Sequence, residues 1–281
     1  MTKCNFINQK DSKFLIISGE DSKDFLQSLI TNDINKCFNN NIIYSCLLSP
    51  QGKFIADFFI SNYSGKYLIE VHEKLFDYFL SKIKIYKLRS KIEIEENIDF
   101  HSIILFEKNI FKESNKDIFF FKDPRCINLG TKAYIKKSIF NDVVNKLKLN
   151  EISFNVYRKE LMKNLIPYSP EDLIINKSLL LENNFQNLNA IDWNKGCYVG
   201  QEITARMKYR SLLKKQLYVL KISSGTVKLG EILFDNDIKI GEIVSKCDQY
   251  LLAMLKINLA EERKNNKNKL STKSKGKIIF L

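Results

Sequence analysis

Between residues 14 and 94, strand-like and helix-like segments alternate in an order that few folds accommodate. Two segments repeat apolar residues three or four positions apart, as the buried face of a helix does: 21–30 and 75–83. Ser49-Pro50-Gln51-Gly52 has proline and glycine where a type I turn favours them, so it predicts a hairpin. The other apolar runs have the length of strands: 14–17, 43–48, 54–60, 67–71 and 91–94. This order predicts an α+β, ferredoxin-like sandwich.

A second region with the same mixed character follows. A helix is predicted from about Ser153, because Phe154, Tyr157 and Leu161 share one helical face. Three strand-like runs precede it: 103–106, 118–121 and 133–135. The pattern predicts a second α+β subdomain, and the expected divisions of the chain are 1–98, 99–210 and 211–281.

The last region differs because it signals little helix. Turns at Gly225, Gly230 and Gly241 separate short strand-like runs, which favours a small antiparallel β-barrel. The tail from Glu261 alternates Lys and Asn before an apolar end. We expect its middle to be a disordered loop and its end to be a strand that closes the barrel.

The cysteines and the hydropathy pattern restrict the compartment. Six cysteines are spread along the chain without a Cys-x-x-Cys pair, which favours a reducing compartment and predicts no metal site. Such isolated thiols also argue against a self-contained iron–sulfur site. No run of eighteen apolar residues occurs, and the polar start of the sequence lacks the apolar segment of a secretory signal. We therefore expect a cytoplasmic protein with no membrane span.

The net charge of +13 favours an anionic partner, and folate, tRNA and acidic proteins all qualify. The chain is rich in Lys, Asn and Ile throughout, so the same charge is compatible with an ordinary solvated surface. Arginine is rare, and its planar guanidinium is not replaceable by lysine at bidentate or stacked contacts. The six arginines are thus candidates for functional contacts or for structural ion pairs: Arg89, Arg125, Arg158, Arg206, Arg210 and Arg263.

The segment from Lys195 to Arg206 gathers chemically useful side chains into twelve residues. Gly196 and Gly200 lie close to Cys197 and allow unusual backbone angles or a close approach by another group. Lys195 and Arg206 bring positive charge that would stabilise a thiolate at Cys197. The alternative is that Cys197 is a small buried apolar residue between ordinary turn glycines.

This segment resembles the K-G-C-Y-x-G-Q-E-x-x-x-R motif of the YgfZ family, folate-binding proteins related to the glycine-cleavage T-protein. Every fixed position of the motif is present. Similarity also lies at Gly19-Glu20-Asp21, Thr31-Asn32-Asp33, the 49–53 turn and Leu88-Arg89-Ser90-Lys91. The resemblance implies two ferredoxin-like α+β subdomains around a central cleft, with folate bound in residues 1–210 and a C-terminal β-barrel at 211–281.

The resemblance also implies a cofactor and the residues that hold it. The cofactor is tetrahydrofolate or a one-carbon derivative of it. Cys197 is implied as a reactive thiol whose role is open. The motif residues implied in cofactor binding are Lys195, Gly196, Tyr198, Gly200, Gln201, Glu202 and Arg206.

Two carboxylates outside the motif complete the implied site. Glu182 matches a Leu-x-Glu segment whose Glu holds the pterin in T-proteins, and a carboxylate can accept both pterin donors. T-proteins also carry an Asp-Asp pair after the hairpin, but the corresponding residues here are Ala56 and Asp57. A methyl group cannot orient or remove a proton. We therefore expect the folate cleft, including Asp57, to persist without aminomethyl transfer.

Three functions remain open after this reading. The preferred one is an accessory protein that supports assembly or repair of iron–sulfur enzymes, with assembly proteins or client enzymes as partners. The alternatives are a folate-dependent tRNA-modification factor and an aminomethyltransferase-type one-carbon transferase. Ala56 counts against the transferase, and the lack of aromatic residues interleaved with basic ones leaves only a weak tRNA contact. His72 and His101 lie away from every motif and are expected to be structural.

Overall fold

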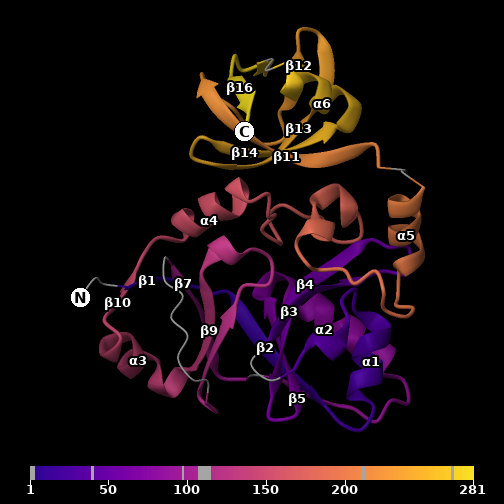
Figure 1. Cartoon of the computed structure of the whole chain (residues 1–281), viewed down its shortest axis with the longest axis vertical. Coiled ribbons are helices and arrows are strands. Elements are labelled where there is room, and N and C mark those ends of the chain that lie inside the picture. Colours follow the sequence, from indigo (N-terminus) through magenta and orange to yellow (C-terminus); the bar gives the residue numbers. More distant parts are fainter. Residues whose placement is uncertain (1–3, 39–40, 97, 107–114, 211–212, 267–268) are drawn as a thin grey trace.

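The computed structural model describes residues 4–38, 41–96, 98–106, 115–210, 213–266 and 269–281. Two five-stranded sheets form the body of the molecule, and a closed β-barrel lies at one end of it (Figure 1). The mixed α+β architecture with a C-terminal antiparallel barrel confirms the predicted fold class.

The first sheet is antiparallel throughout, in the order β3-β4-β5-β2-β6. Without β3, this is the order of a ferredoxin-like sheet, so β3 is an added edge strand. Helix α2 packs on one face, where Phe79 meets Phe58 with ring centroids 4.9 Å apart. The elements are β2 (Ser12–Ser18), α1 (Ser22–Leu29), η1 (Ile34–Lys36), β3 (Ile42–Leu48), β4 (Phe54–Tyr63), β5 (Lys66–His72), α2 (Glu73–Lys87) and β6 (Glu93–Glu96).

The second sheet has the order β10-β1-β7-β9-β8. It is the same ferredoxin-like order with β1 inserted between β10 and β7. Helix α3 packs against it through Phe140, Val143 and Val144. The elements are β1 (Cys4–Asn8), β7 (Phe100–Phe106), β8 (Ile118–Lys122), η2 (Ile127–Leu129), β9 (Thr131–Lys136), η3 (Lys137–Ile139), α3 (Phe140–Lys146), β10 (Leu149–Glu151) and α4 (Phe154–Lys163).

Strand β1 places the start of the chain in the second sheet, so the division at residue 98 does not separate the two sheets. Its side chains alternate between two cores, as a strand with two buried faces requires. Phe6 packs in the core beside α3, and Ile7 packs in the large core that both sheets share. Five residues without alternating polarity are too short a pattern to predict such a strand.

The barrel closes in the order β11-β14-β13-β12-β15-β16. The predicted closing strand is β16, which pairs with β11. The middle of the tail after Glu261 was expected to be a disordered loop, but β15 lies there at residues 270–271, and residues 267–268 lie outside the described residues. The start of the tail lies in α6, a helix that was not predicted. The elements are β11 (Lys215–Ser224), β12 (Ile232–Asp235), β13 (Ile238–Cys247), β14 (Tyr250–Lys256), α6 (Ile257–Asn265), β15 (Leu270–Ser271) and β16 (Lys277–Phe280).

Polar contacts hold α6 on the barrel. Glu261 accepts a hydrogen bond of 2.7 Å from the Tyr218 hydroxyl, and Arg263 pairs with Asp235 at 2.8 Å. Ala260 is the one fully buried residue of the helix. An apolar stripe is the main sequence signal for a helix, so this helix carries little of that signal.

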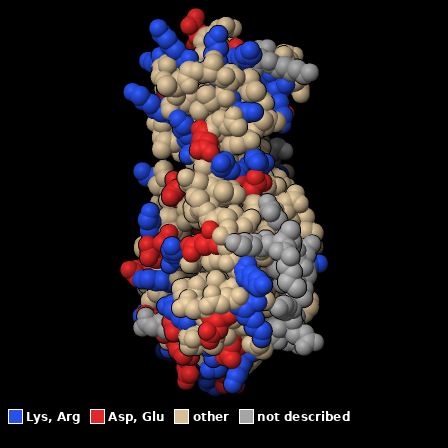
Figure 2. Space-filling model, turned by 90° about the vertical axis from the view of Figure 1, so that its left-hand side faces the viewer, with Lys and Arg blue, Asp and Glu red and all other residues tan. Residues whose placement is uncertain are grey.

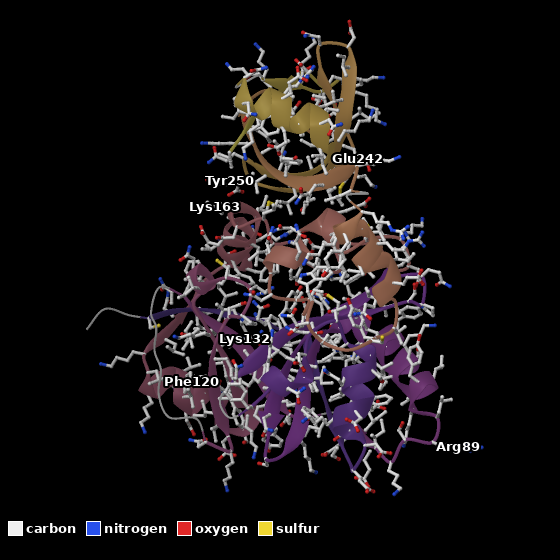
Figure 3. The ribbon with its side chains drawn as sticks, turned by 45° about the vertical axis from the view of Figure 1, so that its right-hand side comes forward. Arg89, Phe120, Lys132, Lys163, Glu242 and Tyr250 are labelled. Carbon is white, nitrogen blue, oxygen red and sulfur yellow. The ribbon has the colours of Figure 1, made fainter. Side chains whose placement is uncertain are left out.

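The barrel packs on the body through α4. Arg158 of α4 is buried and bonds both Asp172 of the body and Ser245 of β13. Lys163 lies over the ring of Tyr250, with its Nζ atom 5.3 Å from the ring centroid (Figure 3). Between α4 and the barrel run η4 (Leu181–Asn183), η5 (Phe185–Asn187) and α5 (Gln201–Tyr209). Among the described residues, no helix is both long and apolar enough to cross a membrane.

Candidate functional site

A cavity of about 60 Å³ lies in the body, with walls from both halves. β4 and β5 contribute Asp57, Phe59 and Glu70, while β9 contributes Lys132. Arg125 and the segment 167–169 close the remaining sides. In Figure 3 Lys132 is in the interior of the body, whereas Arg89 projects from its edge. We refer to this space as the inner chamber.

One ion pair is fully enclosed in the wall of the inner chamber. Lys132 lies 2.7 Å from Glu70, and both side chains are almost inaccessible to solvent. Glu70 also accepts hydrogen bonds from the hydroxyls of Ser12 and Tyr134, at 2.6 and 2.8 Å. Burial alone would raise the pKa of Glu70, but Lys132 and the hydrogen bond from Ser12 help to outweigh burial and lower it. The carboxylate is therefore ionised and committed to its neighbours.

Arg125 is held by its neighbours as firmly as Lys132 is. Its guanidinium makes a bidentate contact with Asp123, at 3.0 and 2.7 Å, and donates to the Tyr157 hydroxyl at 2.6 Å. It also lies over the ring of Phe59, 4.9 Å from the centroid. Arginine is required here because lysine cannot supply two parallel donors and a flat face. The rare arginine thus has a structural ion pair and also lines the cavity.

Asp57 differs from its charged neighbours. It accepts a hydrogen bond of 2.5 Å from the Tyr44 hydroxyl, and within the described part of the chain no cation forms an ion pair with it. Burial raises the pKa of Asp57, against the lowering effect of the Tyr44 bond and the more distant Arg125. An acceptor with no paired cation, at the edge of a small aromatic-lined space, is suited to receive N–H donors from a ligand.

A second cavity of about 400 Å³ adjoins the first, and we refer to it as the outer chamber. Gln9, Ser12, His72 and Tyr168 line both chambers. His72 Nε2 lies 2.9 Å from the Tyr168 hydroxyl, so this hydrogen-bonded pair stands at the junction. Burial lowers the pKa of His72, and Asp11, with a carboxylate oxygen 3.8 Å from Nε2, opposes that shift. The histidine lies next to the candidate cavity, although no sequence motif surrounds it.

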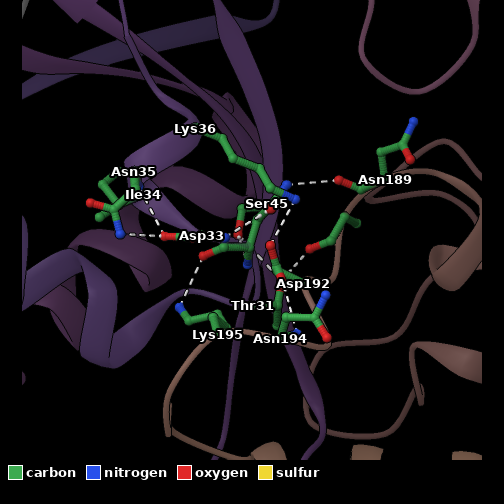
Figure 4. Close-up of polar contacts among 12 residues, drawn as sticks. Thr31, Asp33, Ile34, Asn35, Lys36, Ser45, Asn189, Asp192, Asn194 and Lys195 are labelled. Atoms are coloured by element: carbon green, nitrogen blue, oxygen red, sulfur yellow. Dashed lines mark hydrogen bonds and ion pairs between the residues drawn. The ribbon is translucent and has the colours of Figure 1, made fainter.

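Lys195, the first residue of the motif, is directed into the body. Its ammonium donates to the carbonyl oxygens of Gln27, Ile30 and Asn32 at 2.8, 2.7 and 2.9 Å. Burial lowers the pKa of Lys195 to about 8. Figure 4 shows it among the polar contacts of the 31–36 segment and Asp192, which pairs with Lys36 at 2.7 Å. The expectation that Lys195 supports a thiolate at Cys197 was wrong, because its three donors are used by the carbonyl groups.

The other motif residues occupy several environments. Cys197 is exposed, so the alternative of a buried apolar thiol does not hold, while Tyr198 is buried. Arg206 pairs with Glu202 at 3.4 Å on the exposed side of α5 rather than with Cys197. Gln201 begins α5 directly after Gly200.

The two glycines of the motif serve different purposes. Gly200 has φ of +81°, and an added Cβ would come within 2.4 Å of the Ser49 carbonyl oxygen. The motif therefore packs tightly against the 49–52 turn, which explains why that position needs glycine. Around Gly196 a Cβ would meet nothing within 4 Å, so the expected close approach is not observed there.

Glu182 lies apart from both chambers. Its side chain is 14% exposed, and its carboxylate is 3.4 Å from Lys215 of the first barrel strand. The structure thus separates the predicted site into three places: Asp57 in the inner chamber, Glu182 beneath the barrel, and the 195–206 motif beside the 49–52 turn. Sequence reasoning missed Glu70, Lys132 and Tyr168. Lysine is too common in this chain for Lys132 to attract notice, but the rarity of arginine did point to Arg125.

Comparison of the fold defines the class of protein. The structure of the glycine cleavage system aminomethyltransferase T from Bartonella henselae matches with a TM-score of 0.78. The match covers 99% of this chain and 85% of that one, with 10% sequence identity. The chain therefore has the aminomethyltransferase T fold.

Comparison of the sequence is more specific. A mitochondrial iron–sulfur cluster assembly factor IBA57 homologue from Neurospora crassa is 32% identical over 224 residues, covering 73% of this chain and 51% of that protein. Its counterpart from Mycosarcoma maydis is 27% identical over 219 residues, covering 73% and 54%. The tRNA-modifying protein YgfZ of Aliivibrio fischeri is 26% identical over 267 residues, covering 87% and 82%.

These matches confirm the resemblance: the chain is a homologue of the YgfZ and IBA57 proteins within the aminomethyltransferase T fold. It spans about half the length of the two assembly factors. Searched against family models, the sequence matches none. The assembly factors are named as mitochondrial, and the expected cytoplasmic location of this chain stays a prediction.

Proposed function

We propose that this chain is an accessory protein that supports assembly or repair of iron–sulfur enzymes and binds tetrahydrofolate in its body. The names of the assembly-factor relatives support the first part. The observation that carries the second part is Asp57, an acceptor at an aromatic-lined cavity between the two sheets that has no paired cation among the described residues.

The side chains that line the two chambers carry groups that could bind a folate. Asp57 would accept from the amino and ring N–H groups of the pterin, and Phe59 and Tyr168 supply aromatic surface. Lys10 of the outer chamber, which lies 3.2 Å from Glu151, would exchange that exposed partner for the glutamate tail. Ligand cavities usually measure about 300–1,000 Å³, so the inner chamber alone is too small for the cofactor. The proposal therefore requires both chambers, with the His72–Tyr168 pair displaced between them.

Bound tetrahydrofolate would supply a one-carbon carrier. The protein residues would bind and orient it, and Ala56 offers no group that could move a proton. Ala56 is fully buried in β4, so another residue could not take its place there without repacking. The proposal is therefore a folate-binding accessory role without aminomethyl transfer.

Calorimetric titration with tetrahydrofolate tests the cofactor and the choice of carboxylate. We expect Asp57→Asn to weaken binding by roughly 2–4 kcal/mol, because a charge-assisted acceptor is lost and a donor is placed against a donor. The predicted pterin contact of Glu182 stays a prediction, and Glu182→Gln is its matched variant. A larger loss for Glu182→Gln would move the pterin towards the barrel. No binding to the unmodified protein would reject folate.

Cys197 is the residue through which the accessory role would act. It is the exposed thiol among the six cysteines, and burial raises the pKa of Cys37 to about 12. Cys197→Ser should leave folate affinity nearly intact but abolish rescue of iron–sulfur enzyme activity in a strain that lacks its own homologue. Cys126→Ser, at a half-buried thiol, is the control. Full rescue by Cys197→Ser would make the sulfur incidental.

A further inference from the structure

The exposed side of α5 carries a cluster that neither the cavity nor Cys197 requires. Trp193 and Tyr209 are sixteen positions apart in sequence, but their ring centroids lie 6.3 Å apart. Lys208 Nζ lies 3.8 Å from the Trp193 centroid and 5.3 Å from that of Tyr209. Tyr209 is 68% exposed. We call this region, with Arg206 and Arg210, the α5 surface.

The charge on this surface is largely unmatched. Arg206 has a weak contact with Glu202 at 3.4 Å. Lys208, Arg210 and Lys214 form no ion pair with any carboxylate within the described ranges, and all three are exposed. Two of the six arginines of this lysine-rich chain lie in this one short helix and at its end. The face shown in Figure 2 differs, because Asp and Glu are mixed with Lys and Arg over the body there.

Burial in the core does not account for these side chains. The buried residues of α5 are Thr204 and Met207, so the helix is anchored without Lys208, Tyr209 or Arg210. A large aromatic ring left open to solvent, between cations that form no ion pair within the described part of the chain, suits a flat, anionic partner. Unpaired nucleotides combine a stackable base with a phosphate, whereas an acidic peptide has no planar group to place on the ring.

We propose that the α5 surface binds unpaired RNA, with a base stacked on Tyr209 and phosphates near Lys208 and Arg210. This partner goes beyond the proposed folate and iron–sulfur role and does not depend on it. The sequence predicted no more than a weak tRNA contact, because its aromatic residues are not interleaved with basic ones and Trp193 and Tyr209 are far apart in the chain. The fold brings them together beside the basic end of α5.

Binding of a fluorescent, unstructured oligoribonucleotide to the full chain tests the proposal, measured across a range of salt concentrations. Tyr209→Ala should weaken binding about tenfold, while Tyr209→Phe keeps the ring and should bind like the unmodified protein. The double variant Lys208→Gln, Arg210→Gln should reduce the slope of log affinity against log salt by about 1.4. The same strand paired into a duplex should bind more weakly, since its bases are not free to stack.

A charge-matched control separates this surface from general electrostatics. Lys146→Gln with Lys148→Gln removes the same charge at α3, which lies on the opposite side of the body from α5 (Figure 1). This control should bind RNA like the unmodified protein. Equal losses in the two double variants, unchanged binding by Tyr209→Ala, or a stronger complex with an acidic peptide than with RNA would each overturn the proposal.

Discussion

In the inner chamber the basic groups are paired with carboxylates, while on the α5 surface they are mostly unpaired. Lys132 faces Glu70 at 2.7 Å, and Arg125 makes two bonds with Asp123. On the α5 surface Lys208 and Arg210 are exposed and have no carboxylate partner in the described part of the chain. Burial accounts for the difference, since an enclosed charge without a partner is costly and an exposed one is solvated.

This difference in charge pairing indicates where each region could bind a partner. The paired charges of the chamber mainly fix its walls, and they leave Asp57 as an acceptor that has no paired cation among the residues that the structure describes. The charged side chains of the α5 surface hold few neighbouring groups in place, so they remain available to bind an external anion. Substitutions should therefore reduce stability in the first region and affect binding in the second.

The largest loss of stability is expected for Lys132→Met. It leaves Glu70 buried without its cation, which should lower the free energy of unfolding by about 3–5 kcal/mol. Urea unfolding followed by circular dichroism measures it. Adding Glu70→Leu should recover much of the loss, because two apolar groups replace the pair. A single variant that unfolds like the unmodified protein would show that the chamber wall does not depend on this pair.

A smaller loss is expected for Lys195→Met. Three carbonyl groups would lose their donor, which should cost roughly 2–4 kcal/mol in the free energy of unfolding. Lys208→Met makes the same substitution on the α5 surface and should change that free energy by no more than about 0.5 kcal/mol. Equal effects in the two variants would remove the distinction between an internal lysine of the motif and an external one.

The smallest expected effect is the contribution of His72 to the pH dependence of stability. Burial lowers the pKa of His72 in the folded protein, so the unfolded chain binds its proton more readily. The contribution of neutral His72 is fully present above about pH 6.5 and is lost as pH falls through the lowered folded value. His72→Gln should therefore flatten the decline of the urea midpoint between neutral and mildly acidic pH. An identical decline in both proteins would assign it to other groups.

Much of the fold could be predicted from the sequence, because its elements have clear patterns. The Ser49–Gly52 turn forms as expected, with the Gly52 amide donating to the Ser49 carbonyl at 2.8 Å. Strand β1 and helix α6 were not predicted. One is a short strand buried on both faces, and the other is held by Arg263 and Glu261 rather than by an apolar stripe.

The candidate site was less predictable, because the sequence does not show which distant residues lie close together in the folded chain. The motif identified the exposed Cys197, but it did not show that Lys195 turns inward to three carbonyl groups. Lys132 and Glu70 come from different sheets, and no local pattern links them. The contact between Trp193 and Tyr209 was not predicted for the same reason, because these residues are far apart in the sequence.

Hydrogen–deuterium exchange with and without tetrahydrofolate tests the division between the two regions most directly. We expect slower exchange at residues 57–59, 70, 72 and 167–169, which line the chambers, and no change in residues 193–210. Addition of an oligoribonucleotide should instead slow exchange in residues 193–210 and leave exchange in the chamber residues unchanged. Protection by tetrahydrofolate confined to residues 193–210 would contradict the account, because the cofactor would then lie at the motif and not between the two sheets.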